Sequence, residues 1–233
     1  MEGSQDGRSR DHLLAAIGAR RVGAEGVTEG PLPAVNRFET LYENAHGDPE
    51  LVPWADLRPK PALVEWLAAH PGEGRPALDV GCGLGDNAEA IAAAGYATTA
   101  FDISARAVSW ARERFPASPV DYLRADLFDP PDGWAGAFDL VHECYTVQAL
   151  EGAMRRNAIA AIASFVAPGG RLLLIARTRE EGAEADGPPW PLMPSEIAAF
   201  DRLGLNRESE DHFETERRGR LVPHIRASFR RSG

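Results

Sequence analysis

Asp79-Val80-Gly81-Cys82-Gly83-Leu84-Gly85 is the stretch that decides the fold, because an apolar run becomes a helical pattern here. Residues 77–80 predict a buried strand, and the alanine-rich stretch 86–94 predicts a helix that ends at Gly95. Glycines between a strand and a helix allow a tight turn and let a ligand approach the backbone closely. Open α/β sheets bind ligands at the carboxyl ends of their strands. The stretch therefore predicts a ligand-binding loop in an α/β fold.

The rest of the core alternates strands with helices. We expect further strands at residues 96–101, 120–123, 137–142 and 171–176, and helices at 104–115 and 152–166. Ser104 is a suitable N-cap for the helix that it begins, and Pro168-Gly169-Gly170 is expected to turn the chain. Because the strands are almost continuously apolar, the sheet should be parallel and buried on both faces.

The two ends of the chain depart from this alternation. Residues 1–33, rich in Gly, Arg and Glu, predict a poorly ordered arm with one short helix, and residues 34–233 a single domain. Within that domain, residues 34–60 hold a helix that starts near Asn36 and a Pro/Trp-rich loop, which we expect to cover the site as a lid. After an acidic Gly/Pro-rich loop at 180–191, we expect a helix at 195–203 and a closing hairpin of strands at 205–213 and 222–229.

Two ligands compete for the glycine loop. Residues 83–88 satisfy the dinucleotide pattern G-x-G-x-x-G/A. Asp102 follows about 20 residues on, at the position where NAD-binding proteins carry the acid that binds the ribose. However, Asp79 stands directly before the glycines, where a carboxylate would repel a pyrophosphate but attract an ammonium group. Asp126, after the third strand, could accept from an adenine amino group. These two acids favour S-adenosylmethionine (SAM).

Two more motifs follow in order, Phe138-Asp139-Leu140-Val141 and Ala167-Pro168-Gly169-Gly170-Arg171-Leu172. With the glycine loop and the two acids, they make the chain resemble the class I SAM-dependent methyltransferases. The resemblance implies a Rossmann-like α/β fold with a seven-stranded, mostly parallel sheet of order 3-2-1-4-5-7-6, flanked by helices. An NAD-dependent oxidoreductase stays a remote alternative, although no Tyr-x-x-x-Lys pair is recognisable, and so does a non-catalytic SAM-binding module.

The same resemblance assigns the cofactor residues. The glycines should line the methionine and ribose portion of SAM, Asp102 should accept both ribose hydroxyls, and Asp126 with Leu127 should recognise adenine. The full set is Asp79, Gly81, Gly83, Gly85, Asp102, Ile103, Asp126, Leu127 and Glu143.

The acceptor side is expected after the fourth strand, where Glu143 and Tyr145 are the candidates to orient the acceptor in catalysis. A lone histidine such as His142 beside a strand end is more often structural. Trp54, Tyr145 and Trp190 are the candidate substrate residues, since aromatic walls suit an apolar acceptor and a sulfonium cation; the two tryptophans could equally be core residues.

Residues 53–61 are similar to the P-W-D…R-P-x-P segment of bacterial relatives of thiopurine and thiol methyltransferases, with Ala55 inserted. No Asn-Pro-Pro-Tyr follows the fourth strand, and no dedicated base is evident. Since a thiol ionises near pH 8.5 without help, we expect a small thiol as the acceptor, with O- or N-methylation as the alternative.

Composition narrows the partners. A formal net charge of −10 over 233 residues disfavours nucleic acid. The two cysteines, Cys82 and Cys144, form no disulfide framework and suit a reducing cytoplasm as buried thiols. No signal peptide or membrane-spanning run is visible, and no metal cluster is expected. We expect a cytoplasmic monomer or homodimer that acts on a small molecule.

Overall fold

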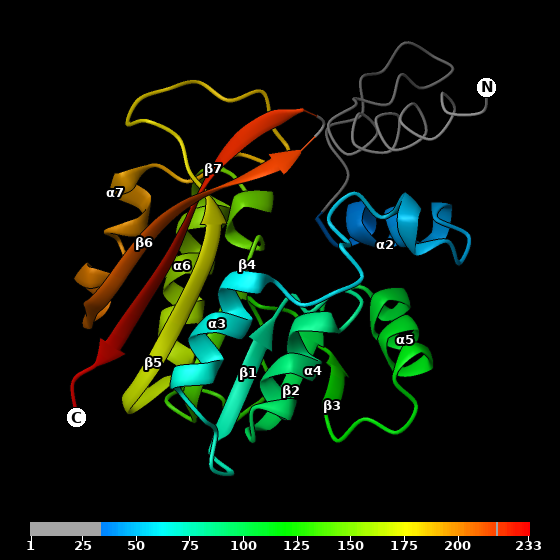
Figure 1. The fold of residues 1–233 in the computed structure, drawn as a ribbon, viewed down its shortest axis with the longest axis horizontal. Helices are drawn as coiled ribbons and strands as arrows, with labels where there is room; N and C mark the ends of the chain where they lie inside the picture. The colour runs from blue at the N-terminus through cyan, green and yellow to red at the C-terminus, as the bar shows by residue number, and fades with distance from the viewer. Residues whose placement is uncertain (1–33, 218) are drawn as a thin grey trace.

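A computed structural model describes residues 34–217 and 219–233. Its centre is a seven-stranded sheet of order β3-β2-β1-β4-β5-β7-β6, in which β7 alone runs antiparallel to its neighbours (Figure 1). The strands are β1 (Pro76–Val80), β2 (Ala97–Asp102), β3 (Asp121–Arg124), β4 (Phe138–Cys144), β5 (Val166–Arg177), β6 (Leu205–Arg217) and β7 (Arg220–Arg231). The predicted strand order is confirmed.

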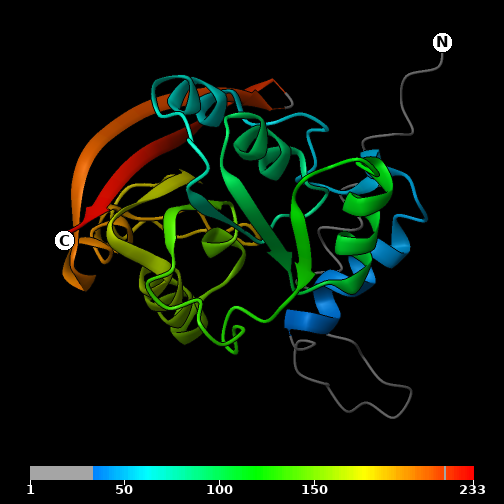
Figure 2. The same cartoon turned by 90° about the horizontal axis from the view of Figure 1, so that it is seen from below.

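Helices cover both faces of the sheet, as the view from below shows (Figure 2). They are α2 (Ala34–Asn44), α3 (Pro61–Ala69), α4 (Asp86–Ala93), α5 (Ala105–Arg114), α6 (Gly152–Phe165) and α7 (Pro194–Ile197), with short 3-10 turns η1 (Pro49–Leu51), η2 (Val147–Ala149) and η3 (Asp201–Leu203). The hydroxyl of Ser104 accepts from the N–H of Ala107 at 3.0 Å, so Ser104 caps α5 as expected.

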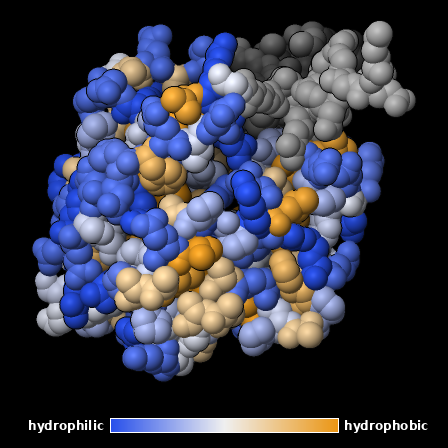
Figure 3. Space-filling model, viewed as in Figure 1, coloured by the Kyte–Doolittle hydropathy of each residue, from blue (hydrophilic) through white to orange (hydrophobic). Residues whose placement is uncertain are grey.

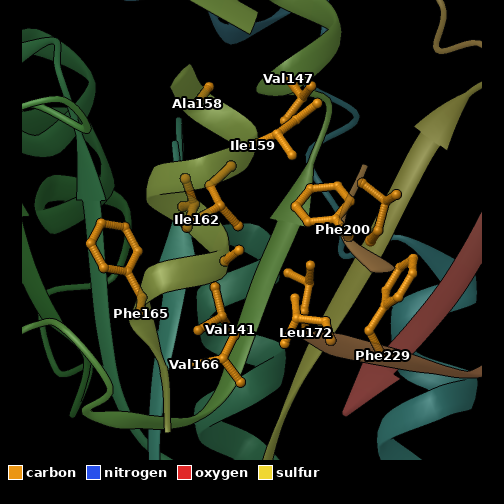
Figure 4. Close-up of a cluster of buried hydrophobic side chains, with 14 of the residues drawn as sticks. Val141, Val147, Ala158, Ile159, Ile162, Phe165, Val166, Leu172, Phe200 and Phe229 are labelled. Carbon is orange, nitrogen blue, oxygen red and sulfur yellow. The ribbon is translucent and has the colours of Figure 1, made fainter. Parts of the chain in front are cut away.

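The core follows from the two-residue period of the strands. Val141 of β4 and Leu172 of β5 face α6, where they pack with Ile162 and Phe165 (Figure 4). Their neighbours along the strands, Leu140 and Leu173, face α3 instead. Because alternate residues of β5 are buried on opposite faces, residues 172–176 are apolar throughout, whereas the edge strand β6 is mostly exposed and polar. The surface is mostly hydrophilic on the face shown in Figure 3, with apolar residues in small groups.

Two expected boundaries are wrong. Pro168-Gly169-Gly170 does not turn the chain before the strand but forms a bulge inside β5, between the pairs Phe138↔Val166 and Leu140↔Arg171. Gly169 has φ +75°, and a Cβ on Gly170 would lie 2.9 Å from the carbonyl of Phe138. The bulge thus lets the backbones of β4 and β5 stay paired.

The helix expected at 195–203 is broken into α7 and η3. Ile197 and Phe200, three residues apart, are both buried in the core. Ile197 ends α7, and Phe200 lies in the turn that precedes η3. The closing hairpin is longer than expected at both strands. The arm expected at residues 1–33 lies outside the described residues.

Candidate functional site

The glycine loop joins β1 to α4, and all three glycines have positive φ: +63° at Gly81, +53° at Gly83 and +90° at Gly85. A Cβ on Gly81 would lie 2.4 Å from Oγ1 of Thr146, and one on Gly85 would lie 2.5 Å from the hydroxyl of Tyr122. These two glycines therefore make room for protein side chains as well as for the turn.

Gly83 has a different environment. A Cβ there would lie 3.1 Å from the hydroxyl of Tyr42 and 3.8 Å from Nε1 of Trp54. Both aromatic residues belong to the segment expected to be a lid. Nε1 of Trp54 donates to the Tyr42 hydroxyl at 3.0 Å, and the ring of Phe38 meets that of Trp54 edge-on at 5.9 Å. The segment 34–60 thus lies over the middle of the glycine loop.

Asp79, at the end of β1, is buried. Its Oδ1 lies 2.6 Å from Nδ1 of His142 on the neighbouring strand β4. Its Oδ2 is buried without a hydrogen-bond partner among the described residues. A buried carboxylate oxygen is costly to leave unpaired, so this atom could accept from a ligand. Sequence reasoning treated His142 as structural and did not pair it with Asp79.

Asp102 ends β2 and ties it to the glycine loop. Its Oδ2 accepts from the N–H of Gly83 at 3.0 Å, and its Oδ1 accepts from the N–H of Ser104 at 2.9 Å. Burial raises the pKa of Asp102 to about 6, against the effect of these two hydrogen bonds. Each carboxylate oxygen keeps a second lone pair for a ligand. Ile103, which follows it, is half-buried.

Asp126, which follows the third strand, lies at the same edge of the sheet as Asp102. The N–H of Ala125 donates to the carbonyl of Asp102 at 3.2 Å, so the residues after β3 lie beside the end of β2. Asp126 is half-buried and its Oδ1 accepts from the N–H of Phe128 at 2.9 Å, while Leu127 is buried. Asp79, Asp102 and Asp126 thus lie at or just after the carboxyl ends of three adjacent parallel strands.

Glu143 is completely buried near the end of β4, where it pairs in register with Val80. Its Oε1 accepts from the N–H of Val147 at 2.9 Å, and its Oε2 has no hydrogen-bond partner among the described residues. Burial raises the pKa of Glu143 to about 7. The side chain is therefore placed to hold the turn after β4, next to the glycine loop.

Tyr145 follows β4 with φ +71°, a strained conformation for a tyrosine. Its hydroxyl lies 2.8 Å from Nε2 of His224 on β7. Nδ1 of His224 lies 2.8 Å from the carbonyl of Val222, to which it must donate, so Nε2 accepts the Tyr145 proton. Burial lowers the pKa of His224 to about 4 and keeps the ring neutral.

Sequence reasoning missed the surroundings of Tyr145. The ammonium of Lys60 lies 4.4 Å from the centre of its ring, and the guanidinium of Arg177 lies 5.8 Å from it. Arg177 and His224 face each other because they pair in the antiparallel register of β5 with β7. That register is a long-range property, and no local pattern of the sequence signals it.

The segment 34–60, which we expect to be a lid, is held in place at its C-terminal end. Asp56 pairs with Lys60 and with Arg217, whose Nη2 lies 2.7 Å from Asp56 Oδ1. Arg217 stands at the tip of the β6–β7 hairpin and also donates to the carbonyl of Pro53 at 3.3 Å. The backbone N–H of Lys60 donates to Oδ1 of Asn87 in α4 at 3.0 Å. The hairpin and the first turn of α4 therefore hold the loop that precedes α3.

Trp190 is held mainly through its backbone. Its N–H donates to the carbonyl of Gln148, and its carbonyl accepts from Arg155, both at 2.8 Å. Its ring covers Gly187 of its own loop, where a Cβ would lie 2.1 Å from the ring. Trp190 thus packs on the loop beside η2, and no described contact joins its ring to Tyr145 or Trp54.

Cys82 and Cys144 are free. Cys82 packs among the side chains of α4 and α5, whereas Cys144 packs on the face covered by α3. Burial raises the pKa of both thiols. Within the described ranges, no group of three or more His, Cys, Asp or Glu side chains is arranged to hold a metal ion. None of the described helices has the length and apolar character needed to cross a membrane.

Comparison with known sequences places this geometry in context. Residues 77–170 match the model of a family described as a methyltransferase domain. The chain is 33% identical over 115 residues to a ubiquinone biosynthesis O-methyltransferase from Aromatoleum aromaticum, covering 48% of each protein. It is 31% identical over 119 residues to the protein of the same name from Erwinia tasmaniensis, covering 49% of this chain and 48% of that one. The chain spans about half the length of these curated relatives.

Solved structures are similar over more of the chain. One, described as "Conversion of a Disulfide Bond into a Thioacetal Group during Echinomycin Biosynthesis", has a TM-score of 0.69 at 24% identity and covers 86% of this chain and 94% of that one. The N-methyltransferase NodS from Bradyrhizobium japonicum, in complex with S-adenosyl-L-homocysteine, has a TM-score of 0.65 at 19% identity and covers 84% and 98%. At these identities the likeness concerns the fold, which is Rossmann-like.

Proposed function

We propose that this chain is a SAM-dependent methyltransferase that acts on a small molecule. The observation that carries the proposal is the unpartnered, buried Oδ2 of Asp79 at the start of the glycine loop. An ammonium group would satisfy this oxygen, and the methionine portion of SAM carries one. A dinucleotide would bring a pyrophosphate instead, which the carboxylate would repel. The match of residues 77–170 to a methyltransferase domain supports the same conclusion.

The other acids fit the rest of the cofactor. In this proposal Asp102 accepts from the ribose hydroxyls with its free lone pairs, and Asp126 with Leu127 meets adenine. Ile103 and the three glycines line the cofactor between them. Glu143 would hold the turn after β4 beside the glycine loop. Tyr42, which the sequence did not single out, is added as a residue that covers Gly83 together with Trp54.

When bound, SAM supplies an activated methyl group on a good leaving group. The residues of the chain then have to position the acceptor in line with that methyl and exclude water. Tyr42 and Trp54 close the side of the glycine loop. Tyr145, fixed by its hydrogen bond to His224, presents its ring to the acceptor. Trp190 borders the far side of the pocket in this proposal.

The side chains around Tyr145 favour an acceptor that ionises by itself. Glu143 is sealed from solvent, and His224 is a weak base that already accepts from Tyr145. Lys60 and Arg177 place positive charge beside Tyr145, which stabilises an anionic nucleophile. A small thiol meets these conditions best, so we propose S-methylation of a thiol as the reaction.

O-methylation of an acidic hydroxyl is the second candidate. The ubiquinone biosynthesis O-methyltransferases, at 31–33% identity, favour it. A phenol would also gain from the positive charge near Tyr145, because its anion is stabilised in the same way. The proposal further comprises a cytoplasmic monomer or homodimer without nucleic-acid partners, since the chain carries a net charge of −10.

Turnover of SAM to S-adenosylhomocysteine with a panel of thiols, phenols and amines tests the proposal. We expect a thiol to be the fastest acceptor and its rate at subsaturating concentration to rise with pH until the thiol is ionised. The midpoint should move when a thiol of different pKa is used. Glu143→Gln should slow this reaction only modestly. A SAM-binding protein without turnover on any acceptor would be a non-catalytic module, and phenols far ahead of every thiol would replace S- by O-methylation.

A further inference from the structure

Three cationic side chains gather beside Tyr145, where the methyl acceptor is expected. Lys60 precedes α3, Arg177 ends β5, and Arg217 stands at the tip of the β6–β7 hairpin. We call these three residues the cationic cluster. In Figure 1 the hairpin tip lies at the same end of the sheet as the carboxyl ends of β4 and β5. The cluster thus adjoins the glycine loop through Tyr145 and Thr146, whose Oγ1 donates to the carbonyl of Val80 at 3.0 Å.

The charges of the cluster are not balanced. Asp56 is the single carboxylate that pairs with it in the described part of the chain, and it serves Lys60 and Arg217. Three positive charges therefore face one negative charge, in a protein whose net charge is −10. His224 stays neutral beside them, because burial and the nearby cations lower its pKa to about 4.

Arg177 is the member of the cationic cluster that has no carboxylate partner among the described residues. Its Nε is buried without a hydrogen-bond partner among these residues. Burial lowers the pKa of this guanidinium, and the charge of Arg217 lowers it further. An unpaired, partly buried guanidinium next to a second one is unfavourable unless an anion comes between them. A guanidinium binds a carboxylate through two parallel hydrogen bonds.

We propose that the methyl acceptor carries a carboxylate group, which Arg177 binds with the help of Arg217 and Lys60. The inference rests on the proposed function, since it concerns the acceptor side of the same site. The nucleophilic atom then lies toward Tyr145, and the carboxylate lies toward the end of β5.

The experiment compares matched acceptors. Each pair consists of a thiol or phenol acid and its primary amide, for example 3-mercaptopropionate with 3-mercaptopropionamide and 4-hydroxybenzoate with 4-hydroxybenzamide. We expect at least one pair in which the wild-type protein uses the acid at a kcat/KM more than about tenfold above that of the amide. In Arg177→Gln the preference should fall to about equal, through a higher KM for the acid alone. Arg177→Lys should restore part of it.

Arg171→Gln is the matched control, because Arg171 lies on the same strand but pairs with Glu208 outside the cluster. It should leave the acid-to-amide ratio unchanged. No acid preference in any pair, or equal losses for acid and amide in Arg177→Gln, would overturn the inference. Titration with S-adenosylhomocysteine separates this failure from failure of the proposed function. If the wild type and Arg177→Gln bind S-adenosylhomocysteine equally, the cofactor site stands and only the inference that the acceptor carries a carboxylate is refuted. If the wild type does not bind S-adenosylhomocysteine, the proposed function fails.

Discussion

Nδ1 of His142 lies 2.6 Å from Oδ1 of Asp79, and both side chains are buried where β4 runs beside β1. The contact fixes the rotation of the carboxylate. Oδ2 of Asp79 is left without a hydrogen-bond partner among the described residues, so a ligand can satisfy it. Under the proposed function, His142 is a positioning residue for the contact between Asp79 and the cofactor, and its own ring stays buried inside the sheet.

Asp79→Asn should weaken binding of S-adenosylhomocysteine, because the negative charge that meets the ammonium is lost. A hydrogen bond to a charged group contributes about 1.5–3 kcal/mol, so the loss in affinity should be roughly tenfold or more. Calorimetric titration measures it. 5′-Methylthioadenosine, which lacks the ammonium, is the control ligand and should bind both proteins alike. Equal weakening of both ligands would contradict the assignment of Asp79.

Asp102→Ala should give a different pattern. Both S-adenosylhomocysteine and 5′-methylthioadenosine contain the ribose hydroxyls, so both should lose affinity, again by about 1.5–3 kcal/mol. Since Asp102 also accepts from Gly83 and Ser104, thermal unfolding must show that the variant is folded. Unchanged affinity for both ligands in a folded variant would remove Asp102 from the site.

The lid should respond to the cofactor. Hydrogen exchange of residues 38–54 should slow when S-adenosylhomocysteine is added, because Tyr42 and Trp54 close over Gly83. Trp54→Phe keeps the aromatic packing but loses the hydrogen bond to Tyr42, so its protection should be smaller. Protection confined to the glycine loop would mean that the segment is a fixed part of the wall rather than a lid.

Glu143 should make stability depend on pH. Its pKa in the folded protein, about 7, lies above its ordinary value of 4.5, so the folded state binds the proton more tightly. The resulting stability is present below pH 4.5 and is lost as the pH rises through 7. The wild type should therefore lose unfolding free energy as the pH rises from 5 to 8, whereas Glu143→Gln should not. The difference between the two proteins should shift in favour of the variant by up to about 3 kcal/mol over this range.

Urea unfolding of the ligand-free protein at the two pH values measures this difference. Glu184→Gln, in the exposed loop before Trp190, is the control and should follow wild type. A constant difference between Glu143→Gln and wild type across this pH range would show that Glu143 does not take up a proton there.

The fold could be predicted because its signals are local. Apolar runs, glycines and the Ser104 cap can each be recognised from neighbouring residues in the sequence. Together they predict that Asp79, Asp102 and Asp126 lie at one edge of the sheet. Tyr42 was missed as a site residue because its part depends on how α2 packs over the glycine loop. Arg177 and His224 were missed because only the register of β5 with β7 brings them together.

The contacts of Trp190 show the same limit. Its position after the fifth strand predicts a pocket wall, which stays a prediction, whereas the packing of its ring on Gly187 of its own loop could not be predicted. The bulge at Pro168-Gly169-Gly170 could not be predicted either. Proline and two glycines predict a turn, and only the pairing of β5 with β4 shows that they lie inside a strand. Loop packing and strand register are decided by partners far away in the sequence.

Calorimetric titration of the wild-type protein with S-adenosylhomocysteine and, separately, with NAD⁺ tests the central claim most directly, because it does not require the acceptor to be known. The account predicts saturable binding of S-adenosylhomocysteine at one site per chain and no binding of NAD⁺. Saturable binding of NAD⁺ without binding of S-adenosylhomocysteine would contradict it.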